Sequence, residues 1–155
     1  METLFMKPHF LCLIWFLFTS LGIQKPTSEN ELNVTAIEKS LNDFSVALAT
    51  ADTISLKRLT GPTFVLLEEG RTYNFQAMIL SIQQVLSTGA KMKRFPSNFH
   101  TEIRGSVAWS NYKVIGEFEN NGSKLPLSLL EAAVLERDGT QWRIVQVATI
   151  PAADK

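Results

Sequence analysis

The feature that most constrains the fold is the segment 125–150 near the end of the chain, LPLSLLEAAVLERDGTQWRIVQVATI. Two long apolar stretches flank Asp138 and Gly139, a dipeptide that favours the tight turn of a β-hairpin. Strict alternation along the second stretch would place Trp142 and Gln146 on one face. The segment therefore predicts two long antiparallel strands that are joined by a two-residue turn and share one buried face.

The first 22 residues are typical of a signal peptide. Lys7 supplies a positive charge, 9–23 is an apolar run, and Ser20 and Gly22 are small residues at positions suited to cleavage. The run is shorter than the roughly 20 apolar residues that a membrane-spanning helix needs. We therefore expect a secreted or periplasmic protein. The alternative is a chain that stays anchored in the membrane by this uncleaved segment.

Charge and cysteine content exclude several classes of function. The chain has 15 acidic and 15 basic residues, and residues 1–22 hold one of each, so the net charge stays zero without them. A chain with no basic excess is not expected to bind nucleic acid. Cys12 and His9 also lie in that segment, which leaves one His and no thiol for a disulfide, a nucleophile or a Cys/His zinc site. No cofactor or metal is expected.

The remaining chain is expected to form a single domain. We expect a flexible lead at 23–30, the domain at 31–150, and a short tail at 151–155. Apolar residues at helical spacing, and Asp52 as an N-cap, predict helices at 31–50, 53–59 and 73–87. Strands are expected at 63–67, 91–95, 98–103 and 107–118, before the hairpin.

This order of elements predicts an α+β fold. Three N-terminal helices would pack on a strongly curved, mostly antiparallel sheet, and such a sheet tends to leave a hollow between itself and the helices.

Glu131 is the candidate for catalysis, because it interrupts an otherwise apolar strand face. A two-residue turn at Asp138 and Gly139 would pair Glu131 with Gln146, whereas a loop longer by one residue would place Ala132 there. A carboxylate held in an apolar wall is the usual way to tune a general acid or base. Alternatively, Glu131 and Gln146 satisfy each other, or Glu131 faces solvent.

The predicted ligand-binding residues are Tyr112, Glu131, Gln146 and Trp142. The hydroxyl of Tyr112 would donate to a ligand carbonyl, unless this residue only anchors the core.

Other charged residues are expected to have structural or solvated roles. Glu68 and Glu69 end a strand, where charges are usually solvated, although one of them would also fit the mouth of a pocket. His100 has no evident carboxylate partner and is expected to be structural or exposed. The basic run 91–94 is expected at a solvated strand edge.

Four segments resemble the SnoaL-like branch of the nuclear transport factor 2-like superfamily, which includes ketosteroid isomerase and polyketide cyclases. They are ALATADTISLKRL (47–59), FVLLEEGRTYNFQAMILSI (64–82), EIRGSVAWSNYKVIGEF (102–118) and AAVLERDGTQWRIVQ (132–146). The resemblance covers 32–150 and implies a cone-shaped α+β barrel whose curved sheet surrounds an apolar pocket.

One departure from the family bears on function. Many relatives continue after Trp-Arg-Ile-Val with one or two His, whereas this chain has Gln146, Val147 and Ala148. A His-based acid/base role is therefore not carried over. The missing His residues and the scarcity of convergent titratable residues favour a secreted domain that binds a small apolar molecule or a partner without catalysis. The alternative is a small isomerase, cyclase or dehydratase that uses Glu131.

A third hypothesis is a homodimer formed through the outer face of the sheet. The residues expected there are Val107, Trp109, Ile115, Val145 and Val147.

Overall fold

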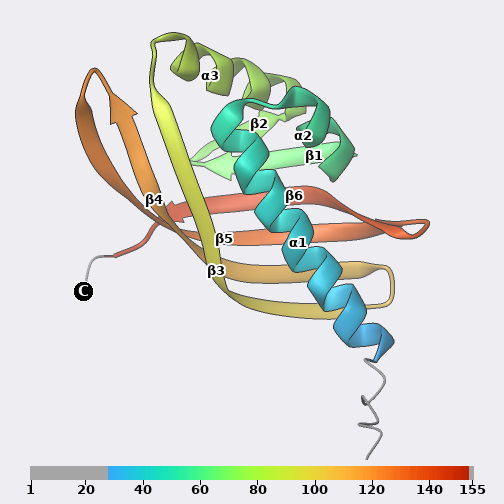
Figure 1. The fold of residues 1–155 in the computed structure, drawn as a ribbon. Helices are drawn as coiled ribbons and strands as arrows, with labels where there is room; N and C mark the ends of the chain where they lie inside the picture. Colours follow the sequence, from blue (N-terminus) through green and yellow to red (C-terminus); the bar gives the residue numbers. More distant parts are fainter. Residues whose placement is uncertain (1–27, 154–155) are drawn as a thin grey trace, which may run out of the picture.

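The computed structural model describes residues 28–153, in which three helices pack against one curved sheet (Figure 1). The predicted signal peptide and residues 23–27 of the predicted lead lie outside the described residues. Between 28 and 153, no helix is both long and apolar enough to cross a membrane. The elements are α1 (Glu29–Thr50), α2 (Thr53–Leu59), β1 (Thr60–Glu68), β2 (Arg71–Asn74), α3 (Phe75–Ser87), β3 (Lys91–Arg104), β4 (Val107–Asn120), β5 (Ser123–Asp138) and β6 (Gln141–Pro151).

Helix α1 confirms the predicted helix and begins two residues earlier. Ser28 caps it: the Ser28 hydroxyl accepts from the backbone N–H of Glu31, and the Glu31 carboxylate accepts from the backbone N–H of Ser28. This capping box satisfies two backbone donors that would otherwise lack partners. The apolar stripe of the helix, which includes Ile37, Leu41 and Phe44, is fully buried against the sheet.

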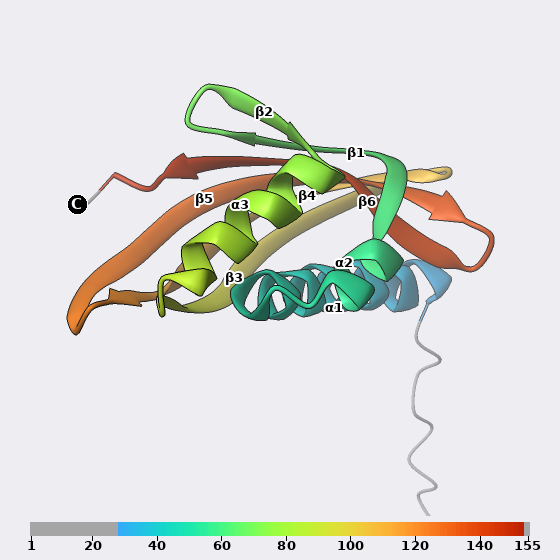
Figure 2. The same ribbon diagram turned by 90° about the horizontal axis from the view of Figure 1, so that it is seen from above.

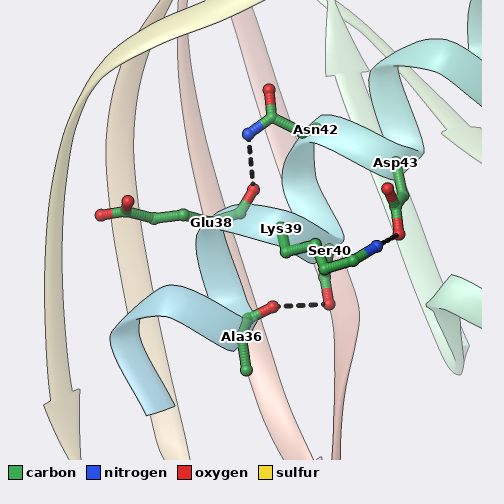
Figure 3. Close-up of polar contacts among 6 residues, drawn as sticks. All are labelled: Ala36, Glu38, Lys39, Ser40, Asn42 and Asp43. Atoms are coloured by element: carbon green, nitrogen blue, oxygen red, sulfur yellow. Dashed lines mark hydrogen bonds and ion pairs between the residues drawn. The ribbon is translucent and has the colours of Figure 1, made fainter. Parts of the chain in front are cut away.

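The other side of α1 is polar, as predicted (Figure 3). Lys39 pairs with Asp43 at 2.6 Å, and the Asn42 side chain donates to the Glu38 carbonyl at 3.0 Å. The Glu38 carboxylate accepts from the Thr101 hydroxyl of β3 at 3.3 Å. This contact ties the helix to the edge strand of the sheet.

The two shorter helices depend on their N-caps. Helix α2 has the predicted bounds and is capped by Asp52, whose carboxylate accepts a first-turn backbone N–H. Helix α3 starts at Phe75, two residues later than predicted, because Asn74 is its cap. The residues before this cap pair with the end of β1 as β2, a short strand that was not predicted.

The six strands form one sheet in the order β2-β1-β6-β5-β4-β3. Only β1 and β6 are parallel, which confirms the mostly antiparallel prediction. Figure 2 shows the three helices on the same side of the sheet, which curves toward them. Strand β3 is continuous where two strands were predicted. It contains a bulge between Ser97 and His100, at which Asn98 adopts a φ of 55°.

The closing hairpin forms, but its turn lies one residue further along than predicted. Asp138 pairs with Gln141, so the two turn residues are Gly139 and Thr140. Gly139 has a φ of 60°, a conformation that glycine adopts without strain. The predicted pairing of Leu135 with Trp142 is therefore wrong.

A bulge at Val145 then reverses the alternation along β6. Ile144 is the last inward residue before the bulge, and Gln146 after it lies on the outer, exposed face. The shifted turn moves the partner of Glu131 two residues along β6, from Gln146 to Ala148, and the extra residue of the bulge moves it one further, to Thr149. The bulge also moves every later side chain of β6 to the other face of the sheet. The predicted pairing of Glu131 with Gln146 is wrong for these reasons.

The core lies between the concave face of the sheet and the helices. Val147 is buried there, so its predicted place on the outer face is wrong, whereas Val107 and Ile115 are exposed as expected. The sheet residues of the core are Phe64, Ala108, Tyr112, Val114, Ala133, Leu135, Trp142, Ile144 and Val147.

Candidate functional site

Four polar side chains form a continuous row across the concave face of the sheet. Glu68 on β1 is in register with Thr149 on β6, Thr149 with Glu131 on β5, and Glu131 with Tyr112 on β4. Residues in register on neighbouring strands project to the same face of a sheet. Because buried polar groups without hydrogen bonds are costly, the contacts of this row decide what it can do.

Glu131 is the centre of the row, and its side chain is only 1% exposed. One carboxylate oxygen, Oε1, accepts from the Thr149 hydroxyl at 3.2 Å and forms an ion pair with the guanidinium of Arg94, whose side chain is 8% exposed. The other oxygen, Oε2, has no partner among residues 28–153, and neither has Nε of Arg94. The pair thus leaves one buried acceptor and one buried donor unused.

Arg94 reaches this position from the edge strand β3. The basic run was predicted to be solvated, which is confirmed for Lys91 and Lys93 and wrong for Arg94. Arg94 pairs with Gly116 on β4, and a Cβ at Gly116 would lie 1.9 Å from the Lys93 carbonyl oxygen. With no side chain at Gly116, the strands approach closely and the Arg94 side chain passes over β4 to Glu131 on β5.

Tyr112 sits beside Glu131, with its ring 5.2 Å from the Phe99 ring. Burial first, and then the negative charge of Glu131, raise the pKa of Tyr112 well above its ordinary value, so its hydroxyl stays protonated. Within the described chain this hydroxyl has no hydrogen-bond partner. Tyr112 packs in the core and, with Glu131, borders a pocket of about 550 Å³. It does not line the cavity between the sheet and the helices, so its contact with a ligand stays a prediction.

A cavity of about 480 Å³ separates the concave face from α1 and α3. Its polar wall contains Arg94, Glu131 and Thr149, together with Glu68 and Glu69 from the end of β1. The rest of the lining is mainly apolar and comes from Phe44, Leu48, Leu66, Tyr73, Ile82, Val85, Met92, Phe118, Leu127, Leu129 and Val147, with Ser81 as a further polar residue.

The pKa of Glu68 depends on its burial and on the charged side chains of this wall. Partial burial raises the pKa of Glu68 above its ordinary value; Arg94 opposes this shift, and the carboxylates of Glu69 and Glu131 add to it. The sequence prediction that one carboxylate of the strand end would fit the mouth of a pocket agrees with this position, because Glu68 and Glu69 both line the cavity.

The remaining predicted residues lie elsewhere. Trp142 is buried toward the start of α1, where its Nε1 donates to Asn33 at 3.3 Å, and Gln146 is exposed on the outer face. Neither lines the cavity. His100 is exposed, 3.6 Å from Glu102. In the part of the chain that the structure describes, no three His, Cys, Asp or Glu side chains are grouped as metal ligands.

Arg94 and Thr149 are the site residues that the sequence did not reveal. Thr149 takes its inward position only because of the bulge at Val145, and Arg94 only because it pairs with Gly116. The one sequence signal for Arg94 is that it lies two residues after Met92, so that both side chains project to the same face of β3. Met92 also lines the cavity.

Many solved structures have this fold, and three of them share 13–17% identity with the chain, a level that shows a common fold and no more. A Mycobacterium tuberculosis protein of unknown function is 14% identical with a TM-score of 0.74, covering 86% of this chain and 79% of its own. A proposed scytalone dehydratase from Novosphingobium aromaticivorans is 13% identical with a TM-score of 0.72, covering 80% and 87%. A ketosteroid isomerase-like protein from Erwinia carotovora atroseptica is 17% identical with a TM-score of 0.65, covering 79% and 98%.

Family membership rests on the sequence itself. Among curated proteins, no sequence matches the chain significantly. The sequence model of the SnoaL-like domain, however, matches residues 37–152, from the first buried turn of α1 to the end of β6. Together with the six-stranded curved sheet, this match shows that the chain belongs to the SnoaL-like domain family.

Proposed function

We propose that this domain binds one small, mostly apolar molecule in the cavity between the sheet and the helices. The observation that carries the proposal is an apolar cavity whose wall includes the buried Arg94–Glu131 pair. Its volume of about 480 Å³ lies within the range of roughly 300–1,000 Å³ that is usual for small-molecule sites.

The unused polar atoms of the pair support the proposal. Oε2 of Glu131 can accept a hydrogen bond, and Nε of Arg94 can donate one, yet neither has a partner within residues 28–153. Buried polar atoms in native proteins are nearly always paired with protein, water or ligand. A ligand with an apolar body and one polar group would fill the cavity and satisfy these atoms.

A matched pair of variants on α3 tests the proposal. Ile82 lines the cavity, whereas Leu80 on the same helix is exposed. Ile82→Trp fills part of the cavity and should abolish binding of a neutral apolar probe such as 1-adamantanol, measured by calorimetry. Leu80→Trp should bind as the unmodified chain does. Equal binding by both variants would place the probe elsewhere and overturn the proposal.

A second candidate function is proton transfer in the same cavity, of the isomerase or dehydratase type. It is favoured by the free Oε2 of Glu131, a buried carboxylate oxygen beside the cavity. A general base must lie within hydrogen-bond reach of the proton that it removes, and Oε2 is the one oxygen of Glu131 without a donor in the described chain.

Hydrogen exchange distinguishes catalysis from binding alone. Catalysis predicts that the protein speeds deuterium exchange at the α-carbon of a cyclic ketone such as 4-tert-butylcyclohexanone, followed by NMR in D₂O. Glu131→Gln should remove this exchange while the ketone still binds. Binding without exchange in the unmodified chain would leave the domain as a binder.

We also propose that the domain acts outside the cytoplasm, as a secreted or periplasmic protein. The support is the sequence of residues 1–22, with its basic start, apolar run and small residues. N-terminal sequencing of protein from the exported fraction should give a chain that begins near residue 23. An intact Met1 in that fraction would favour the anchored alternative.

A further inference from the structure

We propose that the ligand's polar group is a protonated amine, so that the cavity selects an apolar body that carries one positive charge. This inference rests on the proposed binding function and names its ligand class. It is drawn from the charges that line the cavity and from the one buried acceptor that they leave unused.

The cavity lining contains more negatively charged side chains than positively charged ones. Glu68, Glu69 and Glu131 contribute three carboxylates, and Arg94 contributes the one guanidinium. The guanidinium is already paired, since its Nη2 contacts Oε1 of Glu131. An amine that entered the cavity would therefore meet two carboxylates with no cationic partner in the lining and a third that has one free oxygen.

That free oxygen belongs to a buried residue of the cavity wall. Oε2 of Glu131 is buried without a partner among the described residues, on a side chain that is 1% exposed. An ammonium group can donate to Oε2 while Arg94 holds Oε1, so that one carboxylate bridges two cations. Glu68 is in register with Thr149, which in turn is in register with Glu131, and so lies on the same polar row.

A ligand carboxylate fits this wall poorly. It would bring a fourth negative charge toward Glu68, Glu69 and Glu131, with Arg94 already engaged. Like charges brought together in a site of low dielectric repel strongly. The raised pKa of Glu68 is caused first by burial. Arg94 opposes the shift, and the carboxylates of Glu69 and Glu131 add to it, as they would act on a ligand carboxylate.

Matched probes with one body and three polar groups test the inference. We would compare 1-adamantylamine, 1-adamantanol and adamantane-1-carboxylate at pH 7 by calorimetry, and then repeat the series with a 4-phenylbutyl body. The amine should bind at least about tenfold more tightly than the alcohol, and the carboxylate should bind most weakly.

Two substitutions test whether the carboxylates of the cavity wall cause the preference for the amine over the alcohol. Glu68→Gln should lower the ratio of amine to alcohol affinity severalfold. Glu136→Gln is the matched control, because Glu136 is exposed on β5 and does not line the cavity. Since Glu68 is only partly buried, its substitution is compatible with folding, which circular dichroism would verify.

The outcomes separate this inference from the proposed function. Equal binding of the three probes, or tighter binding of the carboxylate, would overturn the amine inference and leave the binding function intact. Failure of every probe to bind the folded chain would overturn the binding function and the inference together. An amine preference that survives Glu68→Gln and Glu131→Gln would also overturn the inference.

Discussion

Arg94 and Glu131 form an ion pair that is almost completely removed from water. Taking two charges out of water costs free energy that their attraction repays only when the remaining polar atoms are also satisfied. Thr149 supplies one further hydrogen bond to Glu131, but Oε2 and the Nε of Arg94 stay unused within the described chain. Stabilisation of the fold alone therefore explains this ion pair poorly, whereas a role in binding a ligand explains it.

Removing one partner of this pair should be more harmful than removing both. Arg94→Met or Glu131→Met leaves an unpaired buried charge and should lower the free energy of unfolding by about 3–5 kcal/mol. Arg94→Met combined with Glu131→Met should cost less than the two single changes added together. Urea denaturation of the four proteins measures this coupling, and additive costs would show that the two side chains act independently.

Glu68 should make stability depend on pH. Its folded-state pKa is raised above the ordinary value of 4.5, so the folded chain holds its proton to a higher pH than the unfolded chain does. The free energy of unfolding therefore begins to fall as the pH rises above about 4.5, where the carboxyl ionises in the unfolded chain. The whole loss is present once the pH exceeds the folded-state pKa of Glu68.

Glu68→Gln removes the loss of stability that ionisation of Glu68 causes in the folded chain. The variant should melt about 1–3 °C higher than the unmodified chain at pH 7, and the difference should vanish below pH 4.5. Thermal melts across this pH range measure the effect. A lower melting temperature at pH 7 would mean that the Glu68 carboxylate stabilises the fold.

At the scale of elements, two local irregularities build the site. The bulge at Val145 turns Val147 and Thr149 toward the helices, and the close approach of β3 to β4 at Gly116 brings Arg94 over the sheet. Bulges and strand glycines often mark places where a sheet bends or where backbones come close. Here both place polar residues on the wall of the cavity.

Gly116→Ala should disturb the pairing of β3 with β4. The added Cβ would lie 1.9 Å from the Lys93 carbonyl oxygen, a backbone atom that can move only if the strand moves. We expect a loss of about 3 kcal/mol or more in the free energy of unfolding, together with weaker ligand binding because Arg94 shifts.

The control for this change is Gly89→Ala. Gly89 has a φ of 83° and no atom within 4 Å of an added Cβ, so the substitution costs only the backbone strain of about 1–2 kcal/mol. Urea denaturation compares the two variants. Equal costs would show that the strands do not approach closely at Gly116.

At the scale of the whole molecule, the sheet has one covered face and one open face (Figure 2). The open face carries exposed aliphatic side chains, among them Ile115, Leu130 and Ile150, and the last two are in register on neighbouring strands. Exposed apolar patches on a sheet face are common in protein–protein contacts. The homodimer hypothesis therefore stays a prediction, with Leu130 and Ile150 in place of Val147.

Leu130→Lys tests that prediction by placing a charge in the middle of the open face. If the chain dimerises through this face, light scattering should give a dimer mass for the unmodified chain and a monomer mass for the variant. Leu80→Lys, at an exposed position of α3, should stay dimeric. A monomer mass for the unmodified chain at high concentration would rule out the dimer.

Much of the fold followed from local patterns. The spacing of Ile37, Leu41 and Phe44 defined α1, Asp52 defined the start of α2, and the apolar stretches around Asp138 defined the last hairpin. These signals depend on residues within a few positions of one another, where helix periodicity and capping act directly. They were sufficient for the α+β class and for placing Glu131 on a strand, whereas the sequence left open whether Glu131 is buried or faces solvent.

The composition of the cavity wall was decided by tertiary structure. The extra residue at Val145 moves Gln146 to the outer face of the sheet and brings Thr149 to the cavity wall. Arg94, which was expected to be a solvated surface charge, pairs with Gly116 and contacts Glu131. Register and strand approach depend on residues far apart in the chain, and alternation alone cannot detect a bulge. The sequence by itself indicated the closing hairpin as a wall of the cavity, whereas strand pairing decided the contribution of β2 and which side chains face the cavity.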